Sequence, residues 1–107
     1  MAVEHVVLMN RKADSVPEEA ERLLQSARRQ FRALPGVLDV RVGVRNAQGE
    51  APPSAYCFLM RFADPQSLAG FLPHPVHAAV GKQLREHFTD FAVHDFAELG
   101  DKPTERP

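Results

Sequence analysis

Several residue types are scarce in this sequence, and each scarcity excludes a class of protein. A single cysteine, Cys57, rules out an internal disulfide. The 13 basic and 14 acidic residues are interspersed, so no basic face is available to neutralise the phosphates of a nucleic acid. No apolar run approaches the roughly 20 residues that a membrane span needs, and the N-terminal segment lacks the basic start of a signal peptide. We therefore expect a cytoplasmic protein that has neither a nucleic acid nor a membrane as partner.

The order of the apolar patterns predicts an α+β fold. Four segments have the alternating or β-branched composition of strands, namely residues 3–9, 37–44, 55–62 and 91–96. Apolar residues recur at helical spacing from Ala20 to Leu34, and again at Val80, Leu84 and Phe88 in a helix expected over 75–88. A short helix is expected over 64–72. The resulting order is β-α-β-β-α-β, with the second helical region broken at Pro73. This is the ferredoxin-like arrangement, in which a four-stranded antiparallel sheet carries its helices on one face.

Local signals place the ends of these elements. Ser15 and Glu18 have the spacing of a capping box at the start of the first long helix. Asp64, followed by a proline, predicts the start of the short helix. In the second strand, strict alternation predicts that Leu38 shares one face with Val40.

The length and the polar segments indicate one domain. A chain of 107 residues buries only about two-thirds of its unfolded surface, so its core is modest. We expect the domain to span residues 1–98 and a disordered tail to span 99–107, which is polar and carries two prolines. The polar segment 45–54 is expected to be a loop, either a plain connector or a lid over a pocket.

Apolar residues on both faces of two strands predict a homodimer. In residues 3–9, Val6 and Leu8 alternate with His5, Val7 and Met9, so both sides of the strand are apolar. Helices cover only one face of this fold, and an antiparallel sheet with a solvated face normally alternates apolar and polar residues. The second face therefore predicts contact with a second copy of the chain.

Three polar side chains fall on faces that are otherwise apolar. They are His77 on the last helix, His5 on the first strand and Tyr56 on the third strand. A buried polar group without a partner is costly, so these residues are either satisfied core groups or the polar part of a pocket. The expected wall of such a pocket, for a small apolar or oxygenated organic ligand, consists of Val7, Met9, Phe58, Met60, Phe71, Leu84 and Phe88.

Asp95 is the predicted partner of one of these histidines. The first and last strands are neighbours in this topology, so Asp95 can approach His5 or the helix that carries His77. A carboxylate bonded to one imidazole nitrogen fixes the tautomer and makes the other nitrogen a better base. His74 and His77, with His5, have a spacing that metal sites also use. No carboxylate or thiolate completes this set, so we expect no metal and no cofactor.

The chain resembles the stress-responsive A/B barrel family, whose members are dimeric α/β barrels. The resemblance rests on five segments in order: Val3–Met9, Pro35–Val37, Arg61–Asp64, Phe71–His77 and Val93–Phe96. It implies a homodimer whose two sheets pack face to face, and a cavity between the sheet and the helices of each subunit.

The resemblance also implies roles for individual residues. A polyketide-cyclising enzyme of this family uses a histidine and a tyrosine, and His77 matches that histidine. His5 matches a pocket histidine, and Asp95 matches an acidic residue at the end of the last strand. The tyrosine position is occupied by Phe71, which has no hydroxyl to donate.

Three functions are compatible with these features. The first is a cofactor-free cyclase, isomerase or lyase in which His77 is the general base, Asp95 orients it, and His5 and Tyr56 bind or polarise the substrate. The second is a non-catalytic stress-response or ligand-binding dimer. The third is a protein similar to the cofactor-free monooxygenases that share the dimeric barrel.

Overall fold

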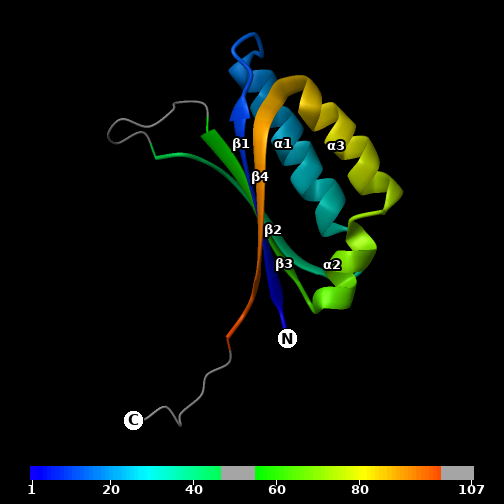
Figure 1. Cartoon of the computed structure of the whole chain (residues 1–107). Helices are drawn as coiled ribbons and strands as arrows, with labels where there is room; N and C mark the ends of the chain where they lie inside the picture. Colours follow the sequence, from blue (N-terminus) through cyan, green and yellow to red (C-terminus); the bar gives the residue numbers. More distant parts are fainter. Residues whose placement is uncertain (47–54, 100–107) are drawn as a thin grey trace, which may run out of the picture.

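Four strands and three helices make up the fold. A computed structural model describes residues 1–46 and 55–99 of the chain. The elements follow in this order (Figure 1): β1 (Val3–Arg11), α1 (Pro17–Arg32), β2 (Val37–Val44), β3 (Ala55–Phe62), α2 (Pro65–Phe71), α3 (Pro75–His87) and β4 (Phe88–Ala97). Residues 47–54 of the predicted loop and residues 100–107 of the predicted tail lie outside the described ranges.

The sheet has the predicted ferredoxin-like topology. The strand order is β2-β3-β1-β4, and β1 pairs antiparallel with both β3 and β4. All three helices lie on one face of the sheet, and the other face is open (Figure 1). The α+β class and the β-α-β-β-α-β order are therefore confirmed, with the second helical region divided into α2 and α3.

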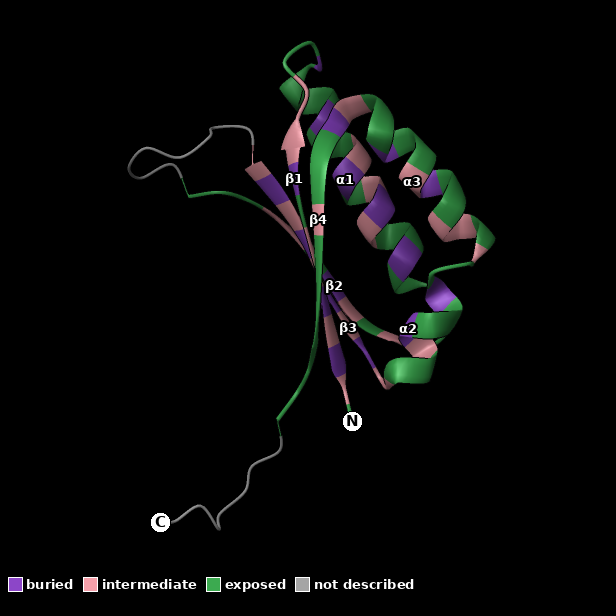
Figure 2. Ribbon diagram, viewed as in Figure 1, coloured by how far each residue is buried: buried purple, intermediate pink, exposed green. Residues whose placement is uncertain are grey.

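The core lies between the helices and the sheet (Figure 2). In β3 every second residue is buried, beginning with Tyr56 and ending with Phe62, because alternate side chains of a strand point to the same face. The predicted stripe of α1 packs on this face, with Leu24 and Phe31 buried. The buried residues recur every 2 positions in the strands and every 3.6 in the helices, and the two sets pack together in one layer.

The predicted capping box at α1 is wrong. Val16 is the residue that precedes the helix, and its side chain caps nothing. The hydroxyl oxygen of Ser15 instead lies 2.7 Å from Nδ1 of His87, at the end of α3. A hydrogen bond to His87, which is distant in the sequence, has replaced the local capping bond that the sequence favours. Ser15 is buried, so its hydroxyl needs such a partner.

The predicted starts of α2 and α3 agree with the structure. The Asp64 carboxylate accepts hydrogen bonds from the hydroxyl and the backbone N–H of Ser67, and both bonds lower the pKa of Asp64. Nδ1 of His74 accepts a hydrogen bond from the backbone N–H of Val76 at 3.1 Å. The His74 imidazole therefore serves as the cap of α3.

Two strands contain bulges that sequence alternation does not reveal. The pairing of β2 with β3 shifts register between Val37 and Asp39, so Leu38 is an extra residue. Leu38 is consequently exposed and does not share the buried face of Val40. The pairing of β1 with β4 also shifts register, between Leu8 and Asn10 of β1. The bulge in β4 lies at Asp90, which has a φ of 57°. This strand also begins at Phe88, three residues before the predicted start.

Candidate functional site

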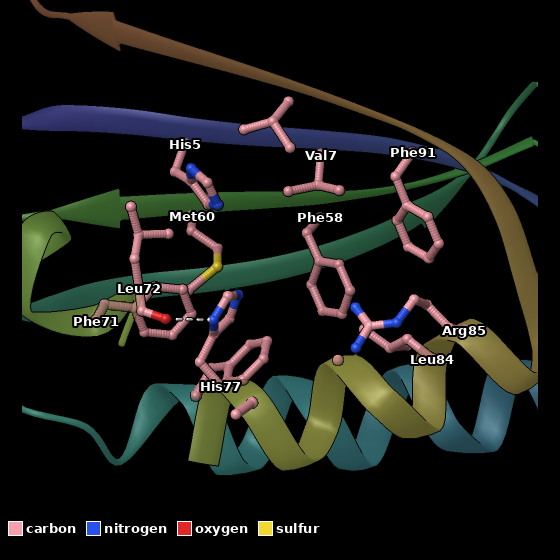
Figure 3. Close-up of a pocket in the computed structure, with 14 residues that line it drawn as sticks. His5, Val7, Phe58, Met60, Phe71, Leu72, His77, Leu84, Arg85 and Phe91 are labelled. Atoms are coloured by element: carbon pink, nitrogen blue, oxygen red, sulfur yellow. Dashed lines mark hydrogen bonds between the residues drawn. The ribbon is translucent and has the colours of Figure 1, made fainter. Parts of the chain in front are cut away.

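A cavity of about 440 Å³ lies between α3 and the helix-facing side of β3, β1 and β4 (Figure 3). Such a volume suits a small organic ligand. The residues that line it are His5, Val7, Phe31, Phe58, Met60, Phe71, Leu72, His77, Ala78, Gly81, Leu84, Arg85, Phe91 and Val93. Its wall is therefore mainly apolar, with two histidines and one arginine as the ionisable groups.

His5 and Asp95 form a pair at one end of this cavity. The two residues lie opposite each other in the β1–β4 register, and Nδ1 of His5 is 2.5 Å from Oδ1 of Asp95. His5 is only 3% exposed, whereas the Asp95 side chain is 42% exposed. A carboxylate accepts hydrogen bonds, so we assign the proton to Nδ1 of His5, which leaves Nε2 as the basic nitrogen. The prediction that Asp95 approaches a histidine thus holds for His5.

His77 is positioned by the backbone and not by Asp95. The Nδ1 atom of His77 lies 2.8 Å from the carbonyl oxygen of Leu72 (Figure 3). Because a carbonyl oxygen can only accept, Nδ1 of His77 donates, and Nε2 is again the nitrogen without a proton in the neutral ring. The predicted orientation of His77 by Asp95 is therefore wrong, since this carboxylate is bonded to His5 in the neighbouring strand.

Phenylalanine rings hold the two histidines in place. The ring centroid of Phe71 is 4.6 Å from that of His77 and 6.1 Å from that of His5. Phe31 contacts the His77 ring at 6.0 Å and the Phe71 ring at 5.0 Å. Phe71 is buried at the centre of this group. Its position next to both imidazoles fits a role in shaping the cavity, and its side chain adds no proton donor.

Not every predicted wall residue reaches the cavity. Val7, Phe58, Met60, Phe71 and Leu84 line it as expected. Met9, Tyr56 and Phe88 lie outside it, although all three are buried. The register explains this difference, because Met9 pairs with Tyr56 in β1 and β3, whereas His5 pairs with Met60. Four residues of a strand span about 13 Å, so Tyr56 shares the face of Met60 but not its place.

Tyr56 has a local partner in place of a ligand. Its hydroxyl donates a hydrogen bond of 2.8 Å to a carboxylate oxygen of Glu21 in α1, and its ring packs edge to face on Phe88. Tyr56 is 6% exposed. Burial, followed by the hydrogen bond and charge of Glu21, raises the pKa of Tyr56 above its usual value of about 10. We therefore assign Tyr56 to the stability of the fold.

This assignment predicts that the tyrosine hydroxyl stabilises the fold less at alkaline pH, and that Tyr56→Phe removes this pH dependence. The raised pKa means that the folded state favours the protonated hydroxyl, so its contribution is complete below the unfolded pKa and is lost as pH rises through the folded pKa. The stability difference between wild type and Tyr56→Phe should shrink above about pH 10. Urea unfolding between pH 7 and 11 measures it, and a constant difference would contradict the assignment. Tyr56 is the only tyrosine, so tyrosinate absorbance reports its titration directly.

Sequence reasoning missed the polar residue at the other end of the cavity. Arg85 lies two turns after His77 on α3, and Gly81 lies between them. The i, i+4, i+8 spacing of these residues is the signal that places them on one helix face. Phe31 and Phe91 were also missed as wall residues. Phe91 follows the bulge at Asp90, which alternation does not predict.

The histidine spacing does not produce a metal site in the part of the chain that the structure describes. Residues 1–46 and 55–99 contain no group of three or more His, Cys, Asp or Glu side chains arranged to hold a metal ion. The imidazole of His74 caps α3, and those of His5 and His77 bond to Asp95 and Leu72. Each imidazole therefore has an assigned protein partner at Nδ1.

The family follows from comparison with known proteins. The family model described as the stress responsive A/B barrel domain matches residues 3–98, which is almost the whole chain. The chain belongs to this family. No curated protein sequence is significantly similar to it. None of the helices that the structure describes is long and apolar enough to cross a membrane.

Solved structures similar to this A/B barrel domain protein share its fold over nearly their full length. A dimeric protein of unknown function with a ferredoxin-like fold from Bacteroides fragilis is 26% identical, with a TM-score of 0.69 over 89% of this chain and 94% of that one. A member of the same family from Mesorhizobium loti is 25% identical, with a TM-score of 0.76 over 92% and 98%. A cofactor-independent oxygenase from Streptomyces nogalater is 18% identical, with a TM-score of 0.74 over 95% and 97%, and shows the fold alone.

Proposed function

We propose that this protein is an enzyme that binds a small carbonyl compound in the cavity and removes a proton from the carbon next to the carbonyl group. The pairing of His5 with Asp95 at the wall of an apolar cavity is the observation that carries this proposal. Such a pair presents Nε2 of His5 as a base, and the carboxylate stabilises the imidazolium that forms. His5 thus takes the role that the sequence assigned to His77, because Asp95 is bonded to His5.

The reaction moves one proton and needs no redox group. The C–H proton passes to Nε2 of His5, and the electron pair of the broken bond forms an enolate. Return of the proton from Nε2 to another carbon completes an isomerisation. Alternatively, the enolate attacks a second carbonyl and closes a ring, and the alkoxide that forms takes the proton back from His5. His77 offers a second Nε2 across the cavity, which can accept a hydrogen bond from a substrate hydroxyl. The ring of Phe71 packs against both imidazoles and gives the enolate an apolar neighbour.

We also propose that the protein acts as a homodimer through the open face of its sheet. Leu8 and Phe96 are exposed there, and Cys57 and Leu59 are half-buried. The similar protein from Bacteroides fragilis is described as dimeric. Contact between two such faces would remove these side chains from water and leave the cavities on the outer, helical side of each subunit.

The test of the enzymatic proposal is deuterium exchange. Wild-type protein in D₂O is incubated with a panel of aryl and alkyl ketones that fit about 440 Å³, and NMR follows the loss of the hydrogen next to the carbonyl. For at least one ketone we expect exchange faster than in buffer. His5→Ala should reduce this acceleration by roughly 10²- to 10⁴-fold, the range for a placed general base.

A matched histidine variant serves as the control for the exchange experiment. His74→Asn removes an imidazole three residues from His77 but keeps a side chain that caps a helix, so exchange should continue at the wild-type rate. Asp95→Asn should fall between wild type and His5→Ala, because the ring keeps a hydrogen-bonding neighbour but loses the charge. Ketones that bind without any exchange would contradict catalysis and support the ligand-binding alternative.

Cofactor-independent oxygenation is a second candidate. The aromatic wall formed by Phe31, Phe58, Phe71 and Phe91 favours a flat aromatic substrate, and a cofactor-independent oxygenase shares the fold. The initial proton removal would be the same, and the electron-rich enolate would then react with O₂. An oxygen electrode added to the exchange assay separates the two reactions, since isomerisation and ring closure consume no oxygen.

A further inference from the structure

The ionisable groups of the cavity are divided between its two ends. His5 and His77 lie near the α2 end, and Arg85 lies on the later part of α3 (Figure 3). The stretch between them is apolar, with Val7 and Phe58 on the sheet side. On the helix side, Ala78 and Gly81 occupy this stretch. Their small size leaves the space between the two ends open.

The Arg85 side chain folds back along α3 toward this open stretch. A Cβ atom added at Gly81 would lie 3.5 Å from Nη1 of Arg85, so the guanidinium group is close to the helix backbone one turn before its own residue. Figure 3 shows the guanidinium group on the sheet side of α3, and Phe58 and Phe91 line the same cavity. The backbones of His77 and Arg85 are roughly 12 Å apart along the helix, because eight residues separate them. The guanidinium group lies closer to His77 than this, since it folds back toward Gly81.

Arg85 has no protein partner among the residues that the structure describes. Within 1–46 and 55–99, no ion pair or hydrogen bond of its guanidinium group is found. Arg61 bonds to Glu4 and Glu98, whereas the described ion pairs include neither Arg22 nor Arg29. What distinguishes Arg85 is its place in the cavity wall. A guanidinium group has five donors in a planar fork that fits a carboxylate in two places. Such a fork at the wall of an apolar cavity suits an anion.

We propose that Arg85 binds the carboxylate of the substrate, whose carbonyl group lies at His5 and His77. This inference rests on the proposed function and narrows its substrate class to apolar keto acids in which an alkyl or aryl body separates the two polar groups. A plain alternative is that Arg85, in the last turn of α3, only stabilises the negative end of the helix dipole. In that case Arg85 would contribute to the stability of the protein, and ligand affinity would not depend on the charge of the ligand.

Binding of matched acids and esters distinguishes these two roles. The probes are ω-benzoylalkanoates with two to eight methylene groups and their methyl esters, and isothermal titration calorimetry gives Kd for each. Arg85 is exposed in the free protein, so for wild type we expect at least one acid to bind roughly three- to tenfold more tightly than its ester. Arg85→Gln should remove this preference by weakening the acid alone, and Arg85→Lys should retain part of it.

The control variant is Lys82→Gln, which removes a positive charge from the same helix at an exposed residue outside the cavity wall. It should preserve the preference for the acid. Equal binding of acid and ester by wild type, or equal weakening of both by Arg85→Gln, would overturn the assignment. The measurement needs no turnover, so a preference for acids together with an absence of deuterium exchange would refute the enzymatic proposal and leave the anion site standing.

Discussion

Among Gly36, Gly43, Gly70 and Gly81, replacement of Gly36 with alanine is expected to cause the largest loss of stability. Gly36 has a φ of 79°, in the left-handed region where a side chain costs roughly 1–2 kcal/mol. A Cβ atom there would also clash with Oγ of Ser67 and lie 2.5 Å from its Cβ. Ser67 cannot move freely, because its N–H and hydroxyl both bond to Asp64 at the start of α2.

The expected cost of Gly36→Ala is about 2–4 kcal/mol, the sum of backbone strain and a displaced helix. For a domain of this size, this corresponds to a fall in Tm of roughly 10–20 °C. Urea and thermal unfolding measure both values. Gly70→Ala is the matched control, since apart from its chain neighbours and the helix's own backbone no atom lies within 4 Å of the added Cβ. Gly70 also sits in a helix, where alanine is favoured over glycine. Gly70→Ala should therefore leave stability unchanged or raise it slightly.

A double-mutant cycle separates the clash from the backbone strain. Ser67→Gly removes the atoms that the new Cβ meets, so Gly36→Ala should cost less in that background than in wild type. The site provides a second readout, because α2 leads into Phe71 and the Leu72 carbonyl that orients His77. An unchanged Tm for Gly36→Ala would show that β2 and α2 do not approach each other in this way.

The layers and faces of this fold were predictable because they depend on period. Alternation along β1 and β3 places His5 and Met60 on the helix side, and the strand order places Asp95 opposite His5. Which histidine bonds to Asp95 was not predictable, because His77 approaches the same end of the cavity from a helix. Only the structure shows that its Nδ1 is already bonded to Leu72.

The position of each residue within a face was less predictable than the face itself. Tyr56 and Met60 share a period and a side of the sheet, but the cavity reaches only Met60. Arg85 was missed for the opposite reason, since exposed arginines near helix ends are common and need no ligand. Gly81 has no side chain, so the guanidinium group of Arg85 can lie over it and reach the cavity. This arrangement depends on the conformation of the Arg85 side chain, which the sequence does not reveal.

The open face of the sheet leads to the second large prediction. The registers align its residues in rows across β3, β1 and β4, with Leu8 between Cys57 and Ala92. The adjacent row holds Leu59, Val6 and His94. The next row is polar on one side, because Arg61 bonds to Glu4 at 2.6 Å and to Glu98 at 2.7 Å. An apolar centre beside a paired polar rim is typical of an interface between proteins.

We expect Leu8→Glu to convert the proposed dimer into monomers. The symmetry of two identical faces doubles the effect, because both copies bring a carboxylate into the apolar centre, where an unpaired charge costs several kcal/mol. The dimer Kd should rise by at least roughly 100-fold. Sedimentation velocity should find about twice the 11.9 kDa chain mass for wild type and the single mass for the variant.

Val16→Glu is the matched control for this experiment. Val16 is 47% exposed and Leu8 is 45% exposed, but Val16 lies just before α1 and not on the open face. The two variants thus carry the same charge change at positions of equal exposure. If the open face is the interface, only Leu8→Glu dissociates, while its circular dichroism and unfolding cooperativity stay those of a folded chain. A wild type that is monomeric at micromolar concentration, or equal dissociation by both variants, would place the apolar rows of this face outside any dimer contact.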